Sequence, residues 1–150
     1  MGTRISHSFR ALVSRLERLY GRPKPPLSDP FELILWENCA YLVDDERRAR
    51  VFERLKREVG LEPEAILAKP LPALAAIIKQ DGGMRPLSRA EKLQTAAELV
   101  LEIGSAALRR MVKQSPGQAR KALRRFPGIG EPSADKILLF CRSHVGLGPD

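Results

Sequence analysis

Cysteine and histidine are scarce in this chain of 150 residues, which contains two of each. Cys39 and Cys141 both fall inside apolar stretches with helical spacing, so neither a disulfide framework nor a C-x2-C metal or cluster motif can be formed. This pattern predicts reduced core cysteines in a cytoplasmic protein. His7 and His144 are isolated in the sequence, which leaves metal binding without support. We therefore expect no metal and no cofactor.

Long apolar runs and aromatic residues are also lacking. No stretch is long enough to span a bilayer, and the N-terminus lacks the apolar core of a signal peptide, so no membrane-spanning segment is expected. Aromatic residues make up 5% of the chain and are scattered, which argues against a platform that stacks single-stranded bases. No feature of the sequence implies an obligate protein partner.

Basic residues, in contrast, are present in excess. Lys and Arg number 26 and Asp and Glu number 18, which gives a net charge of +8. Such an excess favours a polyanionic partner and salt-sensitive binding, although charge alone does not choose among DNA, RNA and an anionic membrane surface. Apolar residues form 43% of the sequence, which is enough for the core of one globular domain.

The apolar periodicity is helical throughout, and no segment has the alternation typical of a strand. Asp29 before Pro30 is an N-capping signal, and Ser88 is predicted to cap a later helix. Many short helices with short connections predict an all-α fold, a compact orthogonal bundle. The expected organisation is an N-terminal helix with a Pro-rich connection over residues 1–26, followed by a helical domain over residues 27–150.

The segment Phe-Pro-Gly-Ile-Gly at residues 126–130 joins two of the predicted helices. Its glycines leave the backbone bare, so a ligand can approach closely and positive φ is available. The free N–H groups of such a turn, with the first turn of the next helix, form a concave site for an anion. Two arginines directly precede the turn, so we expect a nucleic-acid phosphate; the alternative is a glycine-rich connection that binds nothing. The residues assigned to DNA binding are Lys121, Arg124, Arg125, Phe126, Pro127, Gly128, Ile129, Gly130 and Ser133.

This apolar-Pro-Gly-Ile-Gly pattern before an amphipathic helix resembles the helix-hairpin-helix of the endonuclease III superfamily of DNA glycosylases. Two further landmarks precede it in the family's order: the sequence DPFELIL at residues 29–35 resembles the start of the first barrel helix, and residues 77–92 resemble a later helix pair. Taken alone, residues 29–35 would indicate only a capped core helix. The resemblance implies the HhH-GPD fold, duplex DNA rather than a membrane as partner, and base-excision repair, in which a damaged base is flipped out and its N-glycosidic bond hydrolysed.

The resemblance also assigns catalytic positions. Family members have an aspartate shortly beyond the hairpin helix that offsets positive charge at the sugar or directs water, and the matching residue is Asp150. Bifunctional members place a nucleophilic lysine two residues after the second hairpin glycine, where this chain has Pro132, so a monofunctional glycosylase is implied. The family continues through further helices, so the domain is expected to be incomplete at its C-terminus, either as a fragment or as a degenerate relative. The alternative for Asp150 is a solvated terminal aspartate.

A third position concerns the gap left by the flipped base. Family members commonly fill it with a glutamine, and the matching residue is Leu42, with Tyr41 beside it. An apolar wedge can occupy an emptied stack, so both residues are candidates for this role. The alternative is that Tyr41 and Leu42 belong to the core.

The basic residues form two clusters. The cluster over residues 109–125 lies next to the glycine turn and is the expected phosphate-contacting face. The cluster over residues 47–57 is interspersed with acidic residues and is expected to be a solvated helix face. Besides the glycosylase, two functions stay open: a non-catalytic helix-hairpin-helix module that holds duplex DNA, and a helical interaction protein whose charge only keeps it soluble.

Overall fold

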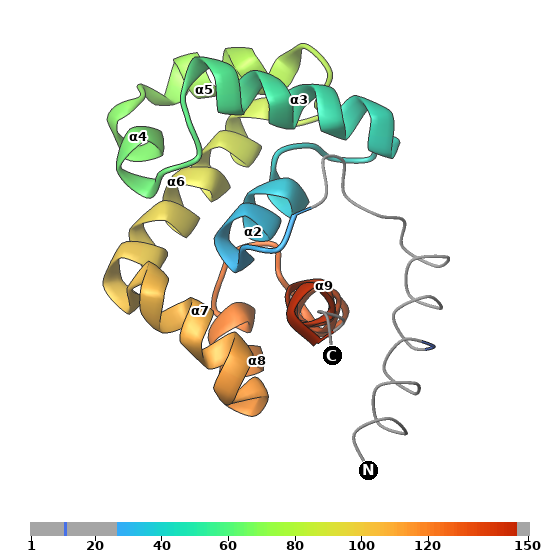
Figure 1. The fold of residues 1–150 in the computed structure, drawn as a ribbon. Helices are drawn as coiled ribbons and strands as arrows, with labels where there is room; N and C mark the ends of the chain where they lie inside the picture. Colours follow the sequence, from blue (N-terminus) through green and yellow to red (C-terminus); the bar gives the residue numbers. More distant parts are fainter. Residues whose placement is uncertain (1–10, 12–26, 147–150) are drawn as a thin grey trace.

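A computed structural model describes Ala11 and residues 27–146, and every regular element in residues 27–146 is a helix (Figure 1). In chain order these are α2 (Pro30–Asn38), α3 (Asp45–Glu58), α4 (Pro63–Ala68), α5 (Leu71–Lys79), α6 (Pro86–Ile103), α7 (Ser105–Gln114), α8 (Pro116–Arg124) and α9 (Glu131–Gly146). The prediction of an all-α fold is confirmed for these residues. Apart from Ala11, the helix predicted within residues 1–26 lies outside the described residues.

Helix α2 lies at the centre of the fold. It contacts α3, α6, α7 and α9, with α3, α4 and α5 on one side and α7, α8 and α9 on the other (Figure 1). Seven of its nine residues are buried, as expected for a helix that is apolar on nearly every face. Helix α6, with 18 residues, runs beside α2 and packs against α4 and α5 as well as α7. The other helices therefore surround one buried helix.

The two predicted N-caps have different outcomes. Asp29 caps α2, because its side chain accepts a hydrogen bond from the backbone N–H of Glu32 at 3.1 Å. The prediction for Ser88 was wrong: α6 begins two residues earlier, at Pro86, and Arg85 occupies the N-cap position without a side-chain capping bond. Proline is favoured at the first helical position because its fixed φ suits the helix and its missing N–H would have no partner there.

Several helices end against side chains of neighbouring helices. The last carbonyls of a helix have no partner inside it, and here arginine and glutamine side chains supply donors. The pairs are Arg48 Nη1 to the carbonyls of Trp36 (2.6 Å) and Glu37 (3.0 Å), Arg54 Nη1 to that of Ile77 (3.3 Å), Gln94 Nε2 to those of Ile66 (3.3 Å) and Lys69 (2.8 Å), and Arg142 Nη1 to that of Val112 (2.8 Å). These three arginines are therefore bound within the fold.

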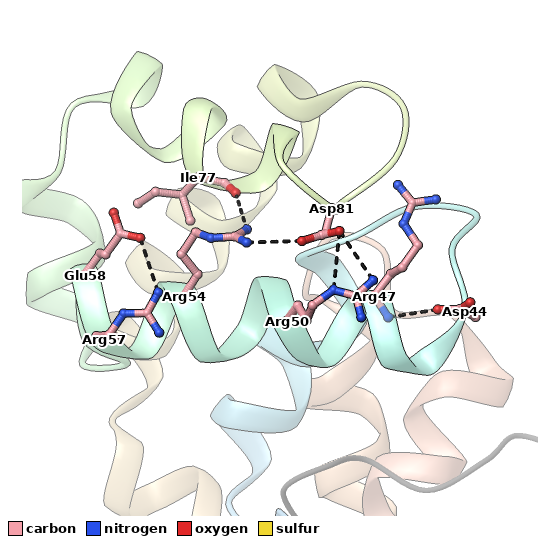
Figure 2. A network of polar contacts seen from close by, with 8 residues as sticks. All are labelled: Asp44, Arg47, Arg50, Arg54, Arg57, Glu58, Ile77 and Asp81. Atoms are coloured by element: carbon pink, nitrogen blue, oxygen red, sulfur yellow. Dashed lines mark hydrogen bonds and ion pairs between the residues drawn. The ribbon is translucent and has the colours of Figure 1, made fainter.

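The basic cluster on α3 is only partly a solvated face. Figure 2 shows Arg54 and Arg50 both reaching Asp81, which follows α5, with N–O distances of 3.1 Å and 3.4 Å. The hydrogen bond from Arg54 is the main reason that the pKa of Asp81 is lowered. The Arg54 side chain is 15% exposed, whereas that of Arg57 is 70% exposed. The expectation of a solvated face thus holds for Arg57 but not for Arg54.

Arg48→Ala is expected to lower the free energy of unfolding by about 2 kcal/mol, because two helix-terminal carbonyls lose a charged donor. Its guanidinium also lies 6.0 Å from the centre of the Trp36 ring, a contact that the variant removes. Arg57→Ala on the same helix is the control and should change stability by less than about 0.5 kcal/mol. Urea unfolding followed by circular dichroism measures both variants. Equal losses in the two would contradict the capping role of Arg48.

Several kinds of reactive site are absent from the described part of the chain. Cys39 and Cys141 are free and buried, and burial raises the pKa of each thiol to about 12, so both stay protonated and unreactive. Among residues 27–146, no group of three or more His, Cys, Asp and Glu side chains could hold a metal ion. In the same region, no helix is long and apolar enough to cross a membrane.

Candidate nucleic-acid interface

Helices α8 and α9 are joined by a tight turn over residues 126–130, here called the hairpin turn. The N–H of Ile129 donates to the carbonyl of Phe126 at 3.3 Å, which closes the turn. The side chains of Phe126 and Ile129 are buried, at 2% and 4% exposure, and belong to the core, while Gly128 and Gly130 are exposed. The apolar residues of the motif therefore anchor the turn, and what it presents to solvent is mainly backbone.

That exposed backbone carries unpaired donors. The N–H groups of Gly128 and Gly130 have no hydrogen-bond acceptor among the residues the structure describes. They lie at the N-terminus of α9, where the helix dipole favours negative charge. The hydroxyl of Ser133 in the first turn of α9 donates to Glu37 at 3.3 Å, so that side chain already has a protein partner. The backbone of the turn thus has the form of an anion site.

The two glycines of the turn serve different purposes. Gly128 has φ of 71°, and a Cβ atom there would collide with the side-chain oxygen of Asn38 on α2. Gly130 has no such constraint: its φ lies outside the left-handed region, and the nearest atom to an added Cβ would be Pro132 Cδ at 3.8 Å. Gly128 is therefore required by the fold, whereas only a close ligand would require Gly130.

Three basic side chains lie beside the hairpin turn: Lys121, Arg124 and Arg125, here called the hairpin cations. All three are exposed, and none has an ion pair within the described residues. Two other members of the predicted basic face are paired, since Arg120 contacts Asp135 at 2.9 Å and Arg109 contacts Asp29 at 3.3 Å. A groove of about 470 Å³ between α8 and α9 is lined by Arg120, Lys121 and Arg124, among others. The charge of the hairpin cations is thus free to meet a partner, as is that of Arg110 and Lys113 on α7, which are also exposed without an ion pair among the described residues.

The candidate wedge residues are exposed. Tyr41 is 38% and Leu42 74% exposed, so the alternative that both belong to the core is wrong. Met84 and Leu87, from the loop before α6 and its first turn, are also exposed, at 62% and 51%. Leu101 is the one other large apolar residue that is exposed in the described region. Tyr41, Leu42, Met84 and Leu87 are here called the apolar tip.

Backbone pairing brings the two loops of the apolar tip together. The N–H of Tyr41 donates to the carbonyl of Gly82 at 2.8 Å, and Tyr41 and Gly83 form a parallel bridge. A Cβ atom on Gly83 would collide with the carbonyl oxygen of Tyr41, so this close approach requires glycine. Leu42 and Arg85, one in each loop, are the non-glycine residues with positive φ in the described part of the chain, each at 59°. Strained backbone of this kind persists where the surroundings hold it, and it is common at binding sites.

A cation lies against the tip. The Arg89 guanidinium is 5.0 Å from the centre of the Tyr41 ring, and its Nε is buried without a partner among the described residues. Burial lowers the pKa of Arg89 from its usual value. Sequence reasoning missed Met84, Leu87 and Arg89, because only the pairing of two distant loops brings their segment next to that of Tyr41. The available signal was Gly82-Gly83 before Pro86, which marks a loop that carries an unexpected apolar residue, Met84.

The structure describes only some of the residues assigned to catalysis. Asp150 lies outside the described residues. Pro132 is exposed in the first turn of α9 and supplies no amine there. The next lysine on this helix, Lys136, has its Nζ 2.7 Å from a carboxylate oxygen of Glu37, and both side chains are 15% exposed. Its amine thus faces α2 and binds a carboxylate.

Comparison with known proteins does not assign a family: no protein-family model matches the chain. No curated protein matches it at a significant level.

Proposed function

We propose that this chain binds duplex DNA through the hairpin turn and belongs to a monofunctional base-excision glycosylase of the endonuclease III type. In this role the protein holds the phosphate backbone, the apolar tip fills the gap left by an extruded base, and Asp150 assists hydrolysis of the N-glycosidic bond. The competing function is a non-catalytic helix-hairpin-helix module that only holds the duplex.

One observation carries the proposal of DNA binding. The exposed N–H groups of Gly128 and Gly130 have no acceptor among the described residues, and the unpaired hairpin cations lie beside them. Backbone donors at a helix N-terminus together with Lys and Arg side chains are a typical phosphate site. Such contacts position a protein on the backbone and carry little base information. Binding is therefore expected to depend on salt and only weakly on sequence.

The apolar tip favours the glycosylase over the simple module. Phosphate binding alone does not require exposed apolar side chains. Leu42 is 74% exposed and Met84 is 62% exposed, and both lie on loops with strained backbone. Apolar side chains that enter a base stack are typical of proteins that kink DNA or extrude a base from it. The Arg89 guanidinium beside Tyr41 adds positive charge where such a tip would meet the duplex.

Gly130→Val is expected to weaken binding to undamaged duplex roughly tenfold, or about 1.4 kcal/mol, because the new side chain keeps a phosphate away from the bare backbone. The fold should tolerate the change, since a Cβ on Gly130 meets only Pro132 Cδ, at 3.8 Å. Fluorescence anisotropy with a labelled duplex, repeated over a salt titration, measures the effect. Ala76→Val is the matched control, because Ala76 is exposed on α5, which lies on the opposite side of α2 from α8 and α9 (Figure 1).

Equal affinities for Gly130→Val and the natural chain at every salt concentration would rule out the hairpin turn as the phosphate site. Gly128 is unsuitable for this test, because its substitution would also displace Asn38. The glycosylase and the module are separated by an excision assay on duplexes that carry uracil, oxidised pyrimidines, alkylated purines or mismatched adenine. Binding without excision across the panel would favour the module.

A further inference from the structure

Asn38, the last residue of α2, joins this helix to the hairpin turn. It is 1% exposed, although it is polar. Its side-chain nitrogen donates to the carbonyl of Ile34 at 3.1 Å and to that of Pro127 at 3.0 Å, 89 residues away. Its side-chain oxygen lies against Gly128 and has no hydrogen-bond partner among the described residues. The amide therefore gains two hydrogen bonds through its nitrogen and leaves its oxygen as an unpaired buried acceptor, which is unfavourable.

The residue before it makes a second connection to the same region. Glu37 pairs with Lys136 at 2.7 Å and accepts a hydrogen bond from Ser133 at 3.3 Å, both on α9. The last turn of α2 is thus bound both to the hairpin turn and to the helix that follows it. Arg48 of α3 binds the carbonyls of Trp36 and Glu37 from another direction. This turn of α2 therefore has little freedom to move relative to the hairpin.

The apolar tip begins three residues after Asn38. Tyr41 is held by the carbonyl of Gly82 at 2.8 Å and by Arg89 against its ring, and Leu42 has left-handed backbone. The hairpin turn and the tip are therefore both fixed to one short stretch of chain. The position of the tip relative to the hairpin turn is thus set before DNA binds. Preorganisation of this kind increases affinity by reducing the entropy lost on binding.

We infer that Asn38 is a positioning residue that couples phosphate binding at the hairpin turn to insertion of the apolar tip. The inference rests on the proposed function and adds to it a reason for the buried amide. Asn38 touches neither the DNA nor the reacting atoms, and it acts through Pro127 and Gly128. With the amide in place, a change that removes binding at the hairpin turn also lowers the contribution of the apolar tip to DNA affinity, and the reverse holds as well.

A double-mutant cycle tests this coupling. Gly130→Val changes the hairpin turn and Leu42→Ala changes the tip; each variant and the double variant are measured for binding to a duplex with one tetrahydrofuran abasic-site analogue. In the chain with Asn38, the double variant should bind at least about fivefold more tightly than the product of the single losses predicts. The same cycle with Asn38→Leu, a side chain of similar size that cannot donate, should give multiplicative losses. A residue that only stabilised the fold would lower the melting temperature without changing this ratio.

Two further variants keep the test decisive. Cys39→Ala is the control, because this buried neighbour bonds to the carbonyls of Trp36 and Arg48 and not to the hairpin, so the coupling should persist. Glu37→Gln removes the charge opposite Lys136 and should reduce the coupling, which provides a second measurement if Asn38→Leu fails to fold. Multiplicative losses in the Asn38 chain would overturn the inference while leaving the proposed function intact. Failure of the natural chain to bind this duplex would overturn both.

Discussion

Replacing Lys121, Arg124 and Arg125 together with alanine is expected to weaken duplex binding about a hundredfold at low salt. The three side chains are exposed and unpaired within the described residues, so their charge can neutralise phosphates. At about 1 kcal/mol for each screened contact, three contacts correspond to roughly two orders of magnitude in affinity. Each neutralised phosphate also releases counterions, so the slope of log K against log salt should fall by about 2.7. Anisotropy titrations over a range of salt concentrations measure both quantities.

A variant with the same loss of charge elsewhere is the control. Arg50, Lys56 and Arg57 are exposed on α3, on the opposite side of α2 from α8 and α9 (Figure 1). Replacing these three with alanine lowers the net charge equally but should leave the salt slope nearly unchanged. Equal losses in the two triple variants would mean that overall charge, not the hairpin, attracts the duplex. In that event the helical interaction protein with a solubilising charge would become the stronger hypothesis.

Local features of the fold could be predicted from the sequence because their causes are local. Asp29 caps α2 through the N–H of Glu32, three residues away, and the glycine breaks lie where the helices end. The hairpin turn, flanked by α8 and α9, was predicted for the same reason, since glycine at Gly128 supplies a positive φ. The wrong prediction for Ser88 also has a local cause. Two signals for a helix start lie two residues apart, and α6 begins at Pro86 rather than after Ser88.

Contacts between distant segments could not be predicted in this way. Nothing in the residues around Asn38 indicates that its amide reaches Pro127, and nothing around Arg48 indicates that it binds the end of α2. The apolar tip depends on a bridge between Tyr41 and Gly83, which periodicity does not reveal. Charge patterning likewise did not separate Arg54, which is held by Asp81, from exposed Arg57. These contacts determine which cations are available to a partner.

The difference between cations bound within the fold and cations free to meet a partner decides how the basic surface can act. The formal charge of +8 counts every Lys and Arg alike. Arg48, Arg54 and Arg142 bind helix-terminal carbonyls, so they neutralise partial charges inside the fold. The hairpin cations, in contrast, are exposed and have no ion pair among the described residues. Their charge is therefore available to a polyanion, and we expect association to be directed to that site.

Asp150→Asn is expected to lower base excision at least about a hundredfold while leaving duplex affinity nearly unchanged. The amide keeps the size of the side chain but can neither take a proton from water nor offset positive charge that develops at the sugar. The product made by the natural protein should be an intact abasic site. Pro132 stands where a Schiff-base lysine would be needed, and the amine of Lys136 is held at 2.7 Å by Glu37.

Strand cleavage with and without alkali distinguishes these outcomes on the panel of damaged duplexes. A monofunctional enzyme gives cleaved strands only after alkali, because hydrolysis leaves the sugar–phosphate backbone unbroken. Borohydride trapping of the natural protein on abasic DNA would show an imine and contradict the assignment. Pro132→Lys provides the complementary test: an amine introduced at the exposed first turn of α9 should allow some trapping, whereas Gly117→Lys on α8 should not. Full excision by Asp150→Asn would instead place the catalytic carboxylate elsewhere, because an amide cannot replace it in either role.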